Sequence, residues 1–244
     1  MKKEDRPLSG RRSPKRNLFT HVVESLGLRI IKGELNPSMP FPKEADLGIE
    51  FAASRSVIRE AVKSLAARGL IASRTRIGIR VLEPVNWNLL DVEVLKWRYS
   101  TMPPTQFYGE LFEIRQMIEP EAARLAALRG KPTEIAAIGK AFAAMSEAGH
   151  AGRQAIAADL AFHRLILAAS HNALLLQMGN LIDVGLDIAH RISQDSFVVF
   201  LPMHRKVAEA IARRDGEAAS KAMHHLLAET QEFLKRRIET LGSS

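Results

Sequence analysis

The chain of 244 residues is long enough for one large domain or two ordinary ones, and its 46% hydrophobic and 25% charged residues are typical of a globular protein. It contains no cysteine, which excludes disulfides, thiolate metal sites and thiol nucleophiles and agrees with a cytoplasmic protein. The net charge of +8 lies in the first third, because residues 1–82 hold 17 Lys or Arg against 8 Asp or Glu, a balance of +9, whereas residues 83–244 hold 18 against 19.

A basic end on a neutral body predicts a polyanionic partner for that end. The balance is still +4 for residues 17–82, with 10 basic against 6 acidic residues, so the tail alone does not account for it. The first residues carry no signal-peptide pattern, and no apolar run approaches the length of about 18 to 20 residues that a bilayer requires. We therefore expect no membrane contact.

The first 82 residues predict a small winged helix-turn-helix behind a tail. Residues 1–16 are polar and basic and predict a disordered tail. The elements expected after it are an amphipathic helix from Leu18 to Gly33, a rigid Pro-rich connector at 36–42, a short helix around 45–51, a helix that Ser54 caps and Gly69 ends, and two strands at 70–71 and 79–82. Three helices and a basic hairpin, over residues 17–82, form the predicted DNA-binding domain.

The remainder predicts an all-α domain. Residues 83–103, which begin with Glu83-Pro84-Val85-Asn86, are assigned to a linker and connecting helix, and residues 104–240 to an all-helical effector-binding domain. Helices are expected at about 88–99, 104–129, 132–148, 153–170, 172–193, 202–214 and 216–239. The predicted fold class is mainly α, with an N-terminal winged helix-turn-helix and a C-terminal helical bundle that is rich in alanine.

The third helix carries the residues expected to contact DNA. Arg55 and Arg59 lie at i and i+4 near its N-terminus, where side chains of such a helix reach base edges in the major groove. Ser54 and Ser56 can bond phosphates at the positive end of the helix dipole, and Lys63 extends the basic face. Arg74, Arg76 and Arg80 can place the wing against the DNA backbone. The alternative is an exposed helix with ordinary surface arginines.

This first region resembles the GntR-type regulators over residues 18–82. The segments that carry the resemblance are 41–47 (Phe-Pro-Lys-Glu-Ala-Asp-Leu), 54–61 (Ser-Arg-Ser-Val-Ile-Arg-Glu-Ala) and 65–71 (Leu-Ala-Ala-Arg-Gly-Leu-Ile). The resemblance implies DNA contacts from Ser54, Arg55, Ser56, Arg59 and the wing glycine Gly78. It departs at Ala45, where the family often has arginine, and at Arg76, which replaces a wing glycine.

The helical region resembles the FCD-type domain of the FadR branch of that family. The segments concerned are 113–126, 159–163 and the helix that includes His204, and the segment 86–97 looks like regulators of sugar-acid operons, such as galactonate repressors. The resemblance implies a homodimer and a small carboxylate or sugar-acid effector.

Three residues of this region form a candidate metal site. Asp159 and His163 lie at i and i+4 on one helix, and His204 from a distant helix can supply a third ligand for a divalent metal such as Zn²⁺, Ni²⁺ or Mn²⁺. The alternative is a buried Asp–His ion pair with an unrelated histidine. By family spacing the fourth ligand falls at Leu226, and His225 lies about 100° away around the helix, so it is not assigned.

Arg115 is the candidate effector-binding residue, because its guanidinium can hold a carboxylate by two hydrogen bonds. The alternative is a salt bridge to Glu119, one helical turn further on.

The predicted function is therefore a repressor that binds a double-stranded DNA operator, is released by a small acid and is not an enzyme. A metal-dependent hydrolase with an incidental basic N-terminus is the first alternative. However, the chain has no His-Glu-x-x-His helix, no Gly-x-Ser-x-Gly elbow and no phosphate loop. A non-specific nucleic-acid binder is the second, although such proteins rarely carry a neutral helical domain of this size.

Overall fold

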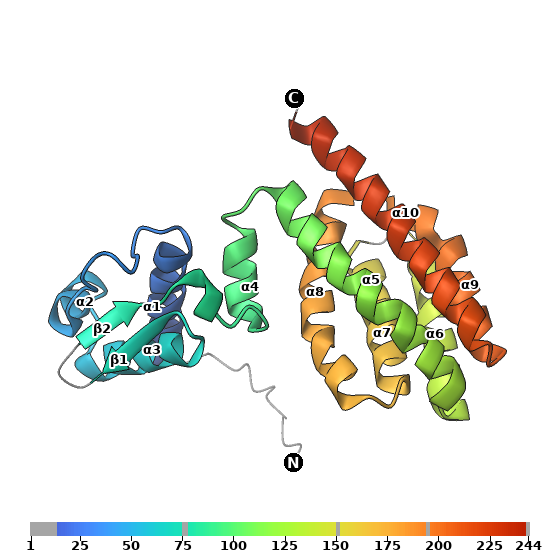
Figure 1. Ribbon diagram of the computed structural model, residues 1–244, viewed down its shortest axis with the longest axis horizontal. Helices are drawn as coiled ribbons and strands as arrows, with labels where there is room; N and C mark the ends of the chain where they lie inside the picture. The colour runs from blue at the N-terminus through green and yellow to red at the C-terminus, as the bar shows by residue number, and fades with distance from the viewer. Residues whose placement is uncertain (1–13, 75–77, 150–151, 194–195, 243–244) are drawn as a thin grey trace, which may run out of the picture. The chain divides into compact units, whose positions relative to one another are not determined.

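The computed structural model describes residues 14–74, 78–149, 152–193 and 196–242 and divides into two compact units, 1–101 and 102–244 (Figure 1). The mainly helical architecture confirms the predicted fold class. Among the described helices none is long and apolar enough to cross a membrane.

The first unit is built on three helices and a hairpin, in the predicted order. Their bounds are α1 Pro14–Ile31, α2 Glu44–Glu50, α3 Arg55–Ala67, β1 Ile71–Arg74 and β2 Gly78–Val81. Ser54 caps α3, as expected, by accepting a hydrogen bond from the Val57 amide at 3.4 Å. Residues 1–13 of the predicted disordered tail lie outside the described part, and the prediction is wrong for residues 14–16, with which α1 begins.

The core of this unit is formed by apolar side chains from all of its helices and strands. The antiparallel strands pair Ile71 with Val81 and Arg74 with Gly78. The core side chains, each at most 5% exposed, include Val22, Leu26, Ile30, Leu47, Ile58, Leu65, Leu70, Ile71, Val81, Val94 and Trp97. Because α3 buries its apolar stripe, its polar face remains at the surface.

The segment that follows the wing packs against the same core. It comprises a 3-10 turn, η1 (Pro84–Asn86), and α4 (Val92–Tyr99). Trp97 of α4 lies directly on α1, since a Cβ atom added to Gly27 would be 2.4 Å from its ring. Gly69, at φ +73°, likewise lets η1 approach, because a Cβ atom there would lie 2.3 Å from the Asn86 carbonyl oxygen. The predicted connecting helix is thus part of the first unit.

The second unit is a helical bundle. Its elements are α5 Pro104–Arg129, α6 Pro132–Ala148, α7 Gly152–Ala169, α8 Ala173–Ser193, η2 Ser196–Phe200, α9 Leu201–Ala212 and α10 Gly216–Gly242, close to the predicted ranges. Helix α5 packs along α10 and also contacts α7, α8 and α9 (Figure 1). The paired alanines at 122–123 and 126–127 are fully buried on α5. Their small side chains let the neighbouring helices approach closely, as the composition predicted.

Candidate functional site

The outward face of α3 presents the residues predicted to contact DNA. Ser54, Arg55, Ser56, Arg59 and Lys63 are all exposed, whereas Ile58, Ala61, Val62 and Leu65 are buried on the opposite side. The Ser54 and Ser56 hydroxyls lie 2.9 Å apart, and Ser54 also caps the helix. The helix therefore offers a basic and hydroxylic face at its N-terminal end.

Two basic residues of this face are held by carboxylates. The Arg59 Nε donates a hydrogen bond to Glu44 Oε2 of α2 at 2.9 Å, and the Arg59 side chain remains 65% exposed. The Lys63 Nζ lies 2.8 Å from Glu60 Oε1 on the same helix. The contact from Glu44 to Arg59 was not predicted, because 15 residues separate the two and no local spacing connects them.

The structure places only part of the predicted wing set. Gly78 opens β2 at φ +86°, a conformation that favours glycine. Arg74 lies on β1, and Arg80, on β2, is exposed. Arg76 lies outside the described residues.

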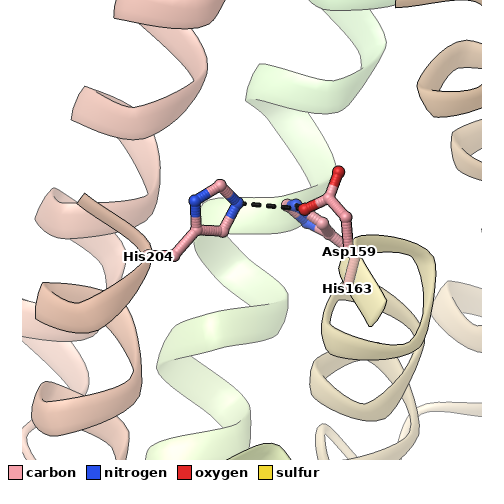
Figure 2. A group of neighbouring side chains, drawn as sticks. All are labelled: Asp159, His163 and His204. Atoms are coloured by element: carbon pink, nitrogen blue, oxygen red, sulfur yellow. Dashed lines mark ion pairs between the residues drawn. The ribbon is translucent and has the colours of Figure 1, made fainter. Parts of the chain in front are cut away.

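The second unit brings together the three predicted metal ligands. Asp159 and His163 come from α7 and His204 from α9, and each is at most 3% exposed. The Asp159 Oδ1 lies 3.1 Å from His204 Nε2 and 3.5 Å from His163 Nε2. Figure 2 shows the His204 ring and the Asp159 carboxylate pointing toward each other, with His163 beside them. One ligand atom from each residue lies within 4.8 Å of the others.

In both imidazoles the nitrogen that faces away from Asp159, Nδ1, has an oxygen partner. The His204 Nδ1 lies 2.9 Å from the Phe200 carbonyl oxygen, and the His163 Nδ1 lies 2.5 Å from Glu119 Oε2. Because a carbonyl oxygen can only accept, His204 donates from Nδ1 to Phe200, and Nε2 is the nitrogen that faces Asp159. A metal-binding histidine is typically held in this way, by an acceptor on its far nitrogen. The donor set and its supports therefore fit a divalent metal.

Helix α5 adds a buried ion pair beside this cluster. The Arg115 Nε donates to Glu119 Oε1 at 2.5 Å, so the salt bridge considered as the alternative for Arg115 is present. Within the described residues, however, the Arg115 Nη1 is buried without a hydrogen-bond partner. The guanidinium also lies over the Phe112 ring, 5.1 Å from its centroid. Arg115 is thus anchored through one nitrogen and retains donor capacity.

Glu119 has a strongly perturbed pKa. Burial raises the pKa of this carboxyl, but Arg115 and His163 outweigh that effect and lower it to about 2. Burial lowers the pKa of His163, and Glu119 and Asp159 outweigh it in turn and raise it to about 9. The Glu119 carboxylate is therefore negatively charged and stabilises a positive charge on the His163 ring. Sequence reasoning found Glu119 only as a partner of Arg115, because 44 residues separate it from His163 and no local pattern connects the two.

The predicted fourth-ligand position does not contribute. Leu226 is buried and apolar on α10, and its neighbours His224 and His225 are exposed. The His225 Nδ1 lies 4.0 Å from Glu229 Oε1 at the surface. In the described part of the chain the group therefore comprises Asp159, His163 and His204.

The chain is similar to known transcriptional regulators along most of its length. It is 34% identical over 224 residues to the uncharacterized HTH-type transcriptional regulator YieP of Escherichia coli, covering 91% of this chain and 97% of the relative. It is 32% identical over 224 residues to the galactonate operon transcriptional repressor of Escherichia coli, covering 90% and 97%. The solved structure of Lar, described as controlling expression of the Listeria monocytogenes agr system, is 17% identical and shares the fold with a TM-score of 0.60 over 93% of this chain and 99% of Lar.

One family match lies in each of the two units. Residues 18–81 match the gntR family of bacterial regulatory proteins, and residues 110–229 match the FCD domain. These families and relatives are transcriptional regulators, and they give the hydrolase alternative no support. The chain belongs to the gntR family of bacterial transcriptional regulators and carries an FCD domain behind its DNA-binding domain.

Proposed function

We propose that this regulator represses an operon for sugar-acid breakdown and that a small carboxylate, bound in the FCD domain, releases it from its operator. The observation that carries the proposal is the buried charged cluster of Arg115, Glu119, Asp159, His163 and His204. The relative described as a galactonate operon repressor supports the choice of a sugar acid. We propose a cytoplasmic location as well, because the DNA that the protein would bind lies there.

The charges of the buried cluster favour an anionic effector once a divalent cation is present. A metal ion binds the His163 ring only in its neutral form, so the ion displaces the proton that the raised pKa of His163 retains. With both rings neutral, Arg115 contributes one positive charge and Glu119 and Asp159 two negative charges, a total of −1. A divalent cation changes this to +1, and one carboxylate then restores neutrality. Because uncompensated charge is costly in a buried site, the cluster with its cation selects an anion.

The proposed metal ligands are Asp159, His163 and His204, which suit Zn²⁺ or a related divalent ion. The bound ion would supply a positive charge and open coordination positions for a carboxylate and an adjacent hydroxyl. Arg115 would bind the same carboxylate through its remaining donors. The requirement for both a charge and a nearby hydroxyl favours hydroxy acids over simple fatty acids.

On the DNA side, we propose that Arg55 and Arg59 contact base edges and that Ser54, Ser56 and Lys63 contact phosphates. Their exposure on one face of α3 supports these roles. Arg74, Arg76 and Gly78 of the wing would contact the backbone or minor groove beside it.

We predict a two-fold symmetric dimer, because a single α3 helix in the major groove contacts too few bases for specific binding. Helix α5 offers an apolar surface for it, with Ile114 39% and Met117 71% exposed on the same face. Light scattering at micromolar concentration should give twice the mass of the chain, and Met117→Glu should shift the equilibrium toward monomer. A wild-type monomer that binds an asymmetric DNA site would contradict the prediction.

The proposed function is tested by an operator-release titration. Purified protein should bind the promoter region beside its own gene more tightly than random DNA at the same salt concentration. We expect D-galactonate or a similar hydroxy acid to weaken this binding by 10- to 100-fold, which corresponds to about 1.4–2.8 kcal/mol of coupling. Acetate at the same ionic strength is the control. Binding that is equal for random DNA would favour the non-specific alternative.

A further inference from the structure

Glu119 lies between the two groups to which the proposed function assigns roles. One of its carboxylate oxygens, Oε1, accepts a hydrogen bond from Arg115 at 2.5 Å, and the other, Oε2, lies 2.5 Å from the His163 Nδ1. All three side chains are about 2% exposed. A single buried carboxylate is therefore shared by the candidate effector residue and a candidate metal ligand.

We propose that Glu119 is a positioning residue that couples the metal site to the effector arginine. It holds the His163 ring with Nε2 directed toward Asp159, and it fixes Arg115 through Nε so that Nη1 is left for another acceptor. This inference rests on the proposed metal and effector roles of these residues. It adds a residue that contacts neither the metal nor the acid.

The coupling follows from the geometry of one rigid group with two partners. The carboxylate cannot rotate or shift toward His163 without lengthening its hydrogen bond to Arg115, and the reverse also holds. An ion that fixes His163 therefore also fixes Glu119 and Arg115, which lowers the entropic cost of binding an acid there. By reciprocity, an acid on Arg115 raises the affinity for the metal by the same factor.

The removal of Glu119 should weaken the metal site without removing a ligand. We expect Glu119→Gln to lower the affinity for Zn²⁺ by 10- to 100-fold, which is the usual effect of losing such a partner of a metal-binding histidine. Glu119→Asp keeps the charge but is one methylene shorter and cannot reach both partners, so it should also weaken Zn²⁺ binding. A purely electrostatic role would leave the aspartate variant at wild-type affinity.

The matched control is Glu121→Gln, on the same helix. Glu121 is 47% exposed in its side chain and pairs with Arg124, so its removal costs one charge and one ion pair away from the cluster. The experiment measures Zn²⁺ affinity of the full-length chain by chelator competition, with circular dichroism to confirm folding. The control should bind Zn²⁺ as the wild type does.

A spectroscopic test needs no variant at position 119. In the wild-type protein with Zn²⁺, ¹⁵N NMR of the histidine rings should show His163 protonated at Nδ1 and metal-bound at Nε2. Metal binding through Nδ1 would overturn the proposal, because Glu119 could not then hold that nitrogen. Folded Glu119 variants with wild-type Zn²⁺ affinity would also overturn it and leave the metal site standing, whereas a wild type that takes up no Zn²⁺ would overturn the metal site itself.

Discussion

Replacing His163 or His204 with alanine is expected to abolish metal uptake and to blunt the response to the effector. Each histidine offers one of the three proposed ligand atoms, which lie within 4.8 Å of one another, and the two that remain would bind a divalent ion weakly. The metal content after purification, measured by elemental analysis, should fall from about one ion per chain to nearly none. Operator affinity without effector should change by less than about 0.5 kcal/mol, because α3 lies in the other unit.

The control for the histidine variants is His225→Ala. The His225 side chain is half exposed on α10 and adjacent to the predicted fourth-ligand position, so it tests whether any nearby histidine contributes. It should retain the wild-type metal content and the wild-type release of DNA. If metal-free wild-type protein shows a full effector response, the metal has no part in the mechanism.

The second large effect is expected for substitutions on α3, the helix proposed to contact the DNA bases. Arg55→Ala and Arg59→Ala should each weaken operator binding by about 1–3 kcal/mol, or roughly 5- to 150-fold, and reduce the preference for the operator over random DNA. Arg59→Ala should have the larger effect. Besides losing the base contact, it leaves Glu44 without its 2.9 Å partner and adds an unpaired negative charge near the phosphates. Fluorescence anisotropy with operator and scrambled duplexes at fixed salt measures both quantities.

Arg29→Ala is the matched control for these arginine variants. Arg29 pairs with Glu50 of α2 at 3.0 Å, so its removal takes away the same charge and a comparable ion pair from the same unit but not from the face of α3. Arg29→Ala should weaken binding to the operator and to the scrambled duplex to a similar small extent. Equal losses on operator and scrambled DNA for Arg59→Ala would make Arg59 a phosphate contact instead.

The local patterns of the chain were sufficient to predict most of its helices and the polar face of α3. The start of α3 follows from Ser54, whose hydroxyl caps the helix, and its end from Gly69, which adopts φ +73°. The polar face of α3 follows from the spacing of its apolar residues at 58, 61, 62 and 65. These features depend on neighbours within about one helical turn, and such interactions are visible in the sequence itself.

The tertiary structure decided the contacts between segments far apart in the chain. Trp97 packs on Gly27, which places α4 in the first unit, although its residues were predicted to connect the two units. Residues 14–16 belong to α1, although their basic and proline-containing composition predicted disorder. In each case the deciding factor is whether a segment packs or continues a helix, and composition alone does not determine this.

The candidate metal site shows the same division. The spacing of Asp159 and His163 placed them on one face of a helix, and the sequence by itself determined that pair. Only the packing of α9 on the bundle brings His204 to within 3.1 Å of Asp159, and only the packing of α5 on α7 brings Glu119 to His163 across 44 residues. Ligands on one helix are positioned by its 3.6-residue period, whereas the partners that orient them are positioned by the crossing of separate helices, which no local spacing encodes.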